Sequence, residues 1–286
     1  MQARQSSTSA QGIALARALE TSKPAGVRVC SDPYARQFIS PALYWLGKLF
    51  TGYGERVGPG AFGFLVARCR YIDDYLQACL DAGARQLVIL GAGLDSRAYR
   101  FEPLKERVKT FEVDRPATLD AKRALLKRVF GQVPPHVAFV PIDFNTETLD
   151  KLCECGYDTR LKTLFICEGV VYYLQAAAVD QTLAFVQKNS GPGSSIVFDY
   201  VYAEALTAPH QRGEIVRMTR TARYTGERLV FGIAEGQVQA FLQARGFEQV
   251  VNVTGQDLER AYFTGPNQGR KVAPVYAIAH ASVAGG

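Results

Sequence analysis

A short apolar run that ends in a glycine turn constrains the fold of this chain more than any other feature. The turn Gly91-Ala92-Gly93 directly follows residues 86–90, which have the sequence QLVIL. Such a run is typical of a buried strand, and open α/β sheets hold nucleotide-like ligands at turns of this kind. Glycine suits the turn because the backbone can approach a ligand closely only where no Cβ intervenes. The sequence therefore predicts a ligand site directly after this strand.

The residues after the turn indicate which ligand it holds. A dinucleotide fingerprint has a third small residue three positions after the second glycine, close to the phosphates. That position is occupied by Ser96, between Asp95 and Arg97, and an acidic side chain is a poor neighbour for a pyrophosphate. The turn therefore favours a cofactor without phosphates, such as S-adenosylmethionine (SAM), over a nicotinamide dinucleotide.

The rest of the chain alternates apolar runs with helical patterns. Strands are predicted at 86–90, 108–113, 137–142, 163–167 and 195–200, with helices near 116–130, 146–154 and 175–189. After a helix at 235–245, the β-rich runs 247–254 and 273–280 are expected to pair as a hairpin at one sheet edge, with a loop at 255–272. This alternation predicts an α/β fold with a doubly wound, mostly parallel sheet of seven strands.

Two segments flank or interrupt the alternation. Residues 11–80 are predicted to form a helical layer that packs on the sheet, acts as a lid over the substrate, or does both. The polar residues 1–10 before it are expected to be disordered. Residues 202–232 are a polar, Arg-rich insertion, expected on the substrate side as a cap. No linker separates these parts, so residues 1–286 are expected to form a single domain.

Composition narrows the class of protein. No apolar run among the 286 residues is long enough to cross a bilayer, and the polar start has no apolar core of a secretory signal. The six cysteines lack paired C-x-x-C spacing, which favours buried thiols over disulfides or zinc. The net charge of +6 is not gathered into a dense tract. We expect a cytoplasmic protein with no metal, membrane or nucleic acid among its partners.

Acidic residues follow the next three predicted strands. Asp114, about 20 residues past the glycines, is the first choice for accepting the ribose hydroxyls, and Glu112 is the second. Asp143 and Phe144 suit the amino group and the ring of adenine. Glu168 follows the fourth strand. Because the ends of parallel strands meet at one edge of a sheet, these residues predict a single cofactor site.

Each of these carboxylates also has a structural explanation. Asp143 could cap a helix that begins near Thr146, and Glu112 could pair with a neighbouring arginine or lysine. One strand that ends in a glycine turn or an acidic residue is common. Four consecutive strands that all end in this way are much less expected by chance. We therefore favour the cofactor site over four separate structural roles.

Longer motifs resemble one family. Residues 91–97 (GAGLDSR), 111–116 (FEVDRP) and 168–174 (EGVVYYL) closely resemble the leucine carboxyl methyltransferase family of class I SAM-dependent methyltransferases. The segments at 32–35, 67–71 and 229–233 match its other blocks. The resemblance covers most of the chain in order. It implies a Rossmann-like methyltransferase fold, SAM as the cofactor, and membership of the bacterial O-methyltransferase branch.

The resemblance also implies roles for residues outside the strand ends. Arg68 matches the arginine that binds the methionine carboxylate of SAM, and Arg17 is similar to a second cation for it. Tyr173 matches a tyrosine near the same carboxylate. The structural alternatives are a solvated charge for Arg68 and a half-buried aromatic side chain for Tyr173. Asp95 and Arg97 are expected to brace the turn as an ion pair.

The acceptor of the methyl group is less constrained than the cofactor. A carboxylate is ionised at neutral pH and needs no general base, which fits three histidines that all lie outside the strand-end motifs. A hydroxyl needs a base, and His210 in the insertion is then the candidate. The insertion also carries arginines that are either a solvated face or cations for an acidic acceptor: Arg212, Arg217, Arg220, Arg223 and Arg228.

The favoured prediction is a SAM-dependent O-methyltransferase that forms the methyl ester of a small acidic metabolite. Short connections favour a small acceptor over the protein C-terminal carboxylate that the family's namesakes methylate. The alternatives are a hydroxyl O-methyltransferase, a protein carboxyl methyltransferase, a nicotinamide-dependent oxidoreductase, and a SAM-binding module without catalysis. The sequence predicts neither the catalytic residues nor the oligomeric state.

Overall fold

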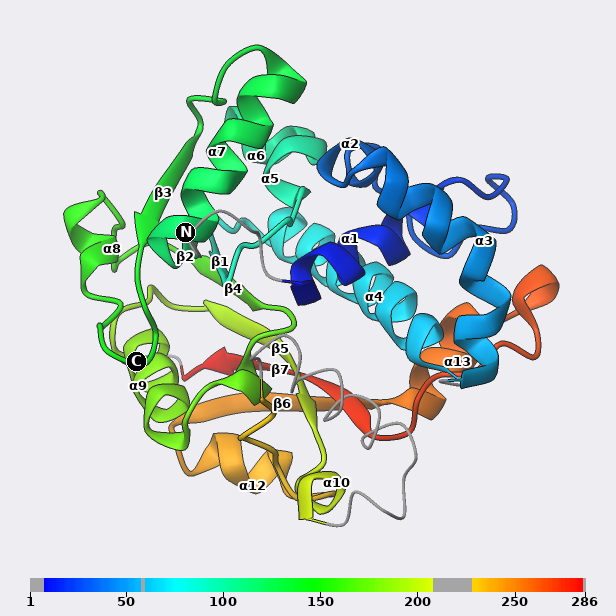
Figure 1. Ribbon diagram of the computed structural model, residues 1–286. Coiled ribbons are helices and arrows are strands. Elements are labelled where there is room, and N and C mark those ends of the chain that lie inside the picture. Colours follow the sequence, from blue (N-terminus) through cyan, green and yellow to red (C-terminus); the bar gives the residue numbers. More distant parts are fainter. Residues whose placement is uncertain (1–7, 58–59, 208–227, 285–286) are drawn as a thin grey trace.

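Seven strands form one sheet in the order β3-β2-β1-β4-β5-β7-β6 in the computed structural model, which describes residues 8–57, 60–207 and 228–284 (Figure 1). The strands are β1 (Gln86–Leu90), β2 (Lys109–Asp114), β3 (Val137–Pro141), β4 (Thr163–Cys167), β5 (Ser195–Val201), β6 (Phe247–Thr254) and β7 (Tyr276–Val283). β1 to β5 are parallel, and β7 lies antiparallel between β5 and β6. The predicted fold class, the seven strands and the edge hairpin are confirmed.

The central strands have continuous apolar sequences because helices cover both faces of the sheet. Every residue of β1 and β4 is buried. Val88 of β1 lies between Phe111 of β2 and Phe165 of β4, and all three side chains are fully buried. The strand order reverses between β1 and β4. The carboxyl ends of these two strands therefore form the switch point at which open α/β sheets bind ligands.

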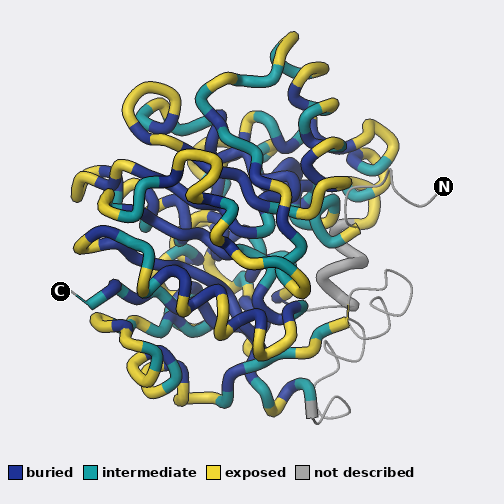
Figure 2. Tube along the Cα trace, turned by 90° about the vertical axis from the view of Figure 1, so that its left-hand side faces the viewer, coloured by how far each residue is buried: buried dark blue, intermediate teal, exposed yellow. Residues whose placement is uncertain are grey.

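Two helical layers sandwich the sheet. One face is covered by α8 (Lys151–Glu154), α9 (Ala176–Lys188) and α12 (Val238–Gln243). The other is covered by α4 (Ala61–Asp81), α5 (Arg97–Arg100), α6 (Glu102–Glu106), α7 (Pro116–Phe130) and α13 (Gly255–Tyr262). The helices bury apolar side chains where they meet the strands, such as Leu152 and Leu242 on the first face and Ile72 and Leu258 on the second. Buried segments accordingly run through the interior of the molecule in Figure 2, and exposed ones lie at its periphery.

The N-terminal helices pack against one another. They are α1 (Thr8–Thr21), α2 (Ala35–Phe38) and α3 (Pro41–Val57), of which α1 and α3 also pack against α4. α1 contacts α2, α3 and α4 (Figure 1), and its small buried residues Ala14 and Ala18 permit close packing. The helical layer predicted at 11–80 is present. Disorder is predicted at 1–10, but residues 8–10 form the first turn of α1, and residues 1–7 lie outside the described part of the chain.

Two predicted connections differ from the structure. The helix predicted at 146–154 is shorter, because only α8 is helical there. The loop predicted at 255–272 is wrong, because it contains α13 and η3 (Gly265–Asn267). α13 begins with a reciprocal capping box, in which Thr254 accepts a hydrogen bond from the Asp257 N–H and the Asp257 carboxylate accepts one from the Thr254 N–H. This capping outweighs the turn-forming tendency of Gly255.

The insertion predicted at 202–232 is described only at its two ends. α10 (Ala203–Thr207) begins it, and a β-bridge between Tyr202 and Ile233 closes its base. His210 and four of the arginines, Arg212, Arg217, Arg220 and Arg223, lie outside the described residues. Arg228 is described. Within residues 8–57, 60–207 and 228–284, no helix combines the length and the hydropathy that crossing a membrane requires.

Candidate cofactor site

A cavity of about 310 Å³ lies at the carboxyl ends of β1 to β4, beside α1. Its volume falls at the lower end of the range for small-molecule sites. Nine of the ten predicted cofactor-binding residues line it: Arg17, Gly91, Ala92, Gly93, Asp114, Asp143, Phe144, Glu168 and Tyr173. Arg68 is not among the lining residues. The structure thus brings the motifs after four different strands together around one cavity.

The glycine turn forms the floor of the cavity and requires its glycines. Gly91 has a φ of +69° and Gly93 a φ of +36°, in the region that side chains disfavour. A Cβ on Gly91 would lie 2.2 Å from Cγ2 of Val170, and one on Gly93 would lie 3.3 Å from Cβ of Ala10 in α1. Any larger residue at Gly91 would therefore fill the space between the turn and the segment after β4.

Asp114 faces the cavity at the end of β2 and is tied to the glycine turn. Its Oδ2 accepts a 2.8 Å hydrogen bond from the Gly93 N–H, and its Oδ1 accepts a 2.7 Å bond from the Arg115 N–H. Burial raises the pKa of the Asp114 carboxyl, although both N–H groups oppose the shift. Since each carboxylate oxygen accepts more than one hydrogen bond, both remain able to accept from a vicinal diol. Glu112, the second choice, lies away from the cavity in an ion pair with Lys122.

Asp143 and Phe144 form the wall after β3. Oδ1 of Asp143 accepts a 3.0 Å hydrogen bond from the Asn145 N–H. Its carbonyl accepts from the N–H groups of Thr146 and Glu147, so Asp143 stabilises a turn rather than the start of α8. Phe144 packs against the core on one side and lines the cavity on the other. Both residues thus line the cavity directly after β3.

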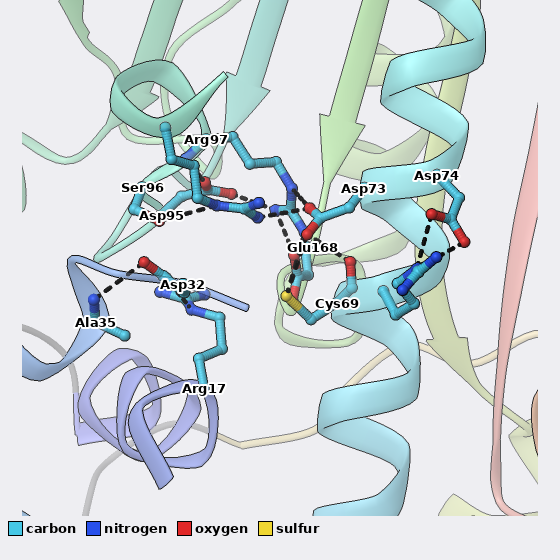
Figure 3. Close-up of polar contacts among 12 residues, drawn as sticks. Arg17, Asp32, Ala35, Cys69, Asp73, Asp74, Asp95, Ser96, Arg97 and Glu168 are labelled. Atoms are coloured by element: carbon cyan, nitrogen blue, oxygen red, sulfur yellow. Dashed lines mark hydrogen bonds and ion pairs between the residues drawn. The ribbon is translucent and has the colours of Figure 1, made fainter. Parts of the chain in front are cut away.

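Arg17 reaches the cavity from α1 with its charge already balanced. Its Nε is 2.9 Å from Oδ2 of Asp32 (Figure 3). Its Nη2 donates a 2.5 Å hydrogen bond to the carbonyl of Leu94. Both Arg17 and Asp32 are buried. Arg17 is therefore not a solvated surface charge. It links the N-terminal layer to the glycine turn.

Glu168 is the centre of a buried network of charges behind the cavity. Its Oε1 accepts a 3.0 Å hydrogen bond from Nε of Arg68, and its Oε2 accepts a 2.6 Å bond from Nη1 of Arg97. Arg97 also binds Asp95 at 2.5 Å and Asp73 at 2.8 Å (Figure 3). Burial raises the pKa of Glu168, but the two guanidinium groups outweigh this and hold it below its ordinary value. The predicted Asp95–Arg97 ion pair is confirmed.

Arg68 is fully buried one layer behind the cavity. Besides Glu168, its guanidinium binds the carboxylate of Asp199 through Nη1. Asp199 in turn accepts a 2.6 Å hydrogen bond from the N–H of Gly169, the residue after Glu168. The solvated charge considered for Arg68 is wrong. Its contacts hold the segment after β4 in place, and they leave the cavity wall to Glu168.

The first turn of α1, which closes the cavity, was not predicted. Ser9, Ala10 and Ile13 line the cavity, and the Ser9 hydroxyl is 3.3 Å from the hydroxyl of Tyr173. The sequence contained a signal for this turn, because Ala10 lies three residues before Ile13 and so extends the helical spacing of residues 13–21 toward the N-terminus. Treating residues 1–10 as one polar leader concealed it.

A family model describes the same chain. The model of the leucine carboxyl methyltransferase family matches residues 10–187. The chain belongs to this family. A relative from Mycobacterium marinum is 30% identical over 90% of this chain and 86% of its own length, and one from Bacillus subtilis is 32% identical over 70% and 66%. Both are provisionally named S-adenosyl-L-methionine-dependent methyltransferases. The expected family is confirmed, and with it the general class of SAM-dependent methyltransferases and their cofactor.

Solved structures have the same fold. A provisionally named methyltransferase from Thermobifida fusca covers 99% of this chain and 96% of its own, with a TM-score of 0.60 and 16% identity. A DUF574 family protein from Streptomyces avermitilis covers 93% and 100%, with a TM-score of 0.58 and 15% identity. At these identities the similarity establishes the class I, Rossmann-like architecture alone.

Proposed function

We propose that this family member transfers the methyl group of SAM to a carboxylate oxygen of a small acidic metabolite in the cytoplasm, forming a methyl ester. The proposal rests on one observation: the described residues around the cavity include an unpaired cation but no histidine that could act as a base. Arg228 lines the cavity, and no carboxylate of the described residues lies within ion-pair distance of it. No histidine of the described residues lines the cavity. A carboxylate acceptor needs a cation to orient it but no base to ionise it.

The residues around the cavity fit SAM along its length. Phe144 and Asp143 would hold the adenine ring and its amino group, and Asp114 the two ribose hydroxyls. The glycine turn leaves open a space that a Cβ on Gly91 would fill. The methionine part carries an ammonium and a carboxylate, which suit Glu168 and Arg17 respectively. When bound, SAM supplies an electrophilic methyl group on a sulfonium.

Arg68 would serve this cofactor through another residue. The resemblance assigns Arg68 to the methionine carboxylate, and direct contact would require it to release Glu168 or Asp199. In its present contacts it orients the Glu168 carboxylate at the cavity wall. Tyr173 is better placed for the methionine end, since it lines the cavity next to Ser9.

In this reaction the protein aligns the acceptor oxygen with the methyl group and excludes water. With SAM bound, the acceptor oxygen would attack the methyl carbon in line with the bond to sulfur, and the C–S bond would break as the O–C bond forms. The electron pair of the broken bond would stay on sulfur, so the charges of carboxylate and sulfonium would cancel and no proton would move. An apolar surrounding favours such a step, and Ile13, Val170 and Leu174 supply it here.

A hydroxyl acceptor is the second candidate, because it would need a base. His136 is occupied by the carbonyl of Ala98, and His280 packs against two tyrosine rings away from the cavity. His210 lies outside the described residues and is the remaining candidate base. The family's namesakes make a protein carboxylate the third candidate. A nicotinamide cofactor is the least suited, since Asp95 lines the cavity next to the glycine turn, and an acidic side chain is a poor neighbour for a pyrophosphate.

Methyl-labelled SAM tests the proposal when it is incubated with the protein and a bacterial extract separated into small molecules and proteins. We expect label in a small molecule and its release as methanol in alkali. Asp114→Asn should abolish the transfer, whereas Asp120→Asn, at an exposed ion pair on α7, should not. Alkali-stable label would favour a hydroxyl acceptor, and label in the protein fraction a protein carboxylate. Absence of both SAM binding and transfer would refute the proposal.

A further inference from the structure

We infer that Lys122 is a positioning residue for the cofactor turn, which it holds in shape from the protein interior. Lys122 lies on α7 and is 1% exposed. Its ammonium donates a 3.1 Å hydrogen bond to the carbonyl of Ala92, the residue between the two glycines of the turn. The same ammonium is 2.8 Å from Oε2 of Glu112 on β2. The inference rests on the proposed function, because it concerns the turn that SAM would contact.

The buried charge of Lys122 requires an explanation other than stability. Glu112 is also fully buried, and its Oε1 accepts a 2.9 Å hydrogen bond from the hydroxyl of Tyr99. A buried ion pair of this kind is often no more stabilising than two apolar side chains of similar volume. An apolar pair, however, could not donate a hydrogen bond to Ala92. The contact with the turn is therefore what a lysine provides here and an apolar residue does not.

The bond from Lys122 completes the set of contacts that shape the turn. The Ala92 N–H donates a 3.0 Å hydrogen bond to the carbonyl of Val113. The Ala92 carbonyl accepts a 2.8 Å bond from the Asp95 N–H and the 3.1 Å bond from Lys122. The Gly93 N–H donates to Asp114 at the cavity. Because Lys122 is buried and does not line the cavity, its bond draws the Ala92 carbonyl toward the interior. That orientation keeps a carbonyl dipole away from the oxygen-rich ribose.

The charge of Lys122 also acts on the carboxylate expected to bind the ribose. Burial raises the pKa of Asp114, and the positive charge of Lys122 is one of the influences that oppose the rise. Loss of Lys122 would thus leave the Ala92 carbonyl with only its bond from the Asp95 N–H, and it would make Asp114 harder to ionise. Both changes weaken the acceptance of hydrogen bonds from a diol.

Binding of S-adenosylhomocysteine to the full chain, measured by calorimetry, tests the inference. We expect Lys122→Met to weaken binding by about ten-fold or more, the size of one hydrogen bond to the ligand that a displaced turn or a protonated Asp114 would lose. Lys109→Met is the matched control, because the Lys109 ammonium donates a 2.8 Å bond to the carbonyl of Gly156 at an exposed site outside the cavity. We expect it to leave the dissociation constant unchanged.

A second variant separates positioning from stability. Lys122→Met alone leaves the Glu112 carboxyl buried without its partner, so we pair it with Glu112→Gln, which removes both charges. The double variant should unfold near the wild-type temperature and still bind S-adenosylhomocysteine about ten-fold more weakly. Wild-type affinity in the folded double variant would show that Lys122 is only structural and overturn the inference. Failure of the wild-type chain to bind would instead count against the proposed function.

Discussion

Arg17 on α1 donates a 2.5 Å hydrogen bond to the carbonyl of Leu94, 77 residues later in the chain. Leu94 directly follows the glycine turn, and Asp32, which balances the charge of Arg17, also accepts the backbone hydrogen bonds that start α2. One buried guanidinium therefore joins two helices of the N-terminal layer to the cofactor turn. The layer is attached to the site through this contact as well as through apolar packing.

Replacement of Arg17 by Met should destabilise the protein strongly. It leaves the Asp32 carboxylate buried without its partner, and we expect the free energy of unfolding to fall by about 3–5 kcal/mol. Urea denaturation measures this fall, and hydrogen exchange should show α1 losing protection first. Arg70→Met is the control, because its exposed pair with Asp74 within α4 should contribute less than about 1 kcal/mol. Equal effects of the two substitutions would contradict this role of Arg17.

Replacement of Arg228 by Gln should affect the acceptor and spare the cofactor. If Arg228 orients an anionic acceptor, the KM for the labelled metabolite should rise about ten-fold, because a charged hydrogen bond is lost. The dissociation constant of S-adenosylhomocysteine should not change. Arg115→Gln is the matched control, since Arg115 is also exposed at the cavity but lies beside Asp114 at the expected ribose end. A KM unchanged by Arg228→Gln would exclude Arg228 from acceptor binding.

Gly91 allows a test of whether space or backbone conformation matters more at the turn. Gly91→Ala would place a Cβ 2.2 Å from Cγ2 of Val170 and would also strain a φ of +69°. Gly91→Ala combined with Val170→Ala removes the collision but keeps the strain, which costs about 1–2 kcal/mol. We expect the single variant to lose S-adenosylhomocysteine binding and the double variant to regain part of it in calorimetry. Identical loss in both would mean that φ alone makes glycine necessary.

The sheet and the strand-end residues could be predicted from the sequence because their signals are local. Each central strand is a continuous apolar run, and the polar residues after it share one edge by the geometry of parallel strands. The partners of buried charges are not local. Arg68 has the same helical context whether it is solvated or bound to Asp199, which lies 131 residues away. A lysine or arginine partner was considered for Glu112, but its identity as Lys122 and the bond from Lys122 to Ala92 were not predictable, for the same reason.

Two helical segments that were not predicted, α13 and the first turn of α1, have recognisable patterns in the sequence. The spacing of Thr254 and Asp257 is that of a capping box, and it would have placed α13 in the predicted loop. In the N-terminal leader, polar composition outweighed a helical spacing that begins before Ile13.

His280 should make the stability of the protein depend on pH below neutrality. It lies on β7, partly buried, with its ring centroid 4.2 Å from that of Tyr75 and 6.2 Å from that of Tyr71 on α4. Burial lowers its pKa from 6.5 to about 4. The unfolded chain therefore takes up a proton near pH 6.5 while the folded chain does not. The contribution of His280 is present above pH 6.5 and is lost as the pH falls toward 4.

His280→Phe keeps a ring against the two tyrosines and removes the titration. Thermal unfolding of both proteins between pH 7 and pH 4.5 measures the effect, and the buried carboxylates titrate alike in each, so their contribution cancels in the difference. We expect the melting temperature of the wild type to fall relative to the variant across this range, by at least about 2 °C. Parallel curves would mean that His280 takes up its proton equally in the folded and unfolded chains, which its packing between β7 and α4 argues against.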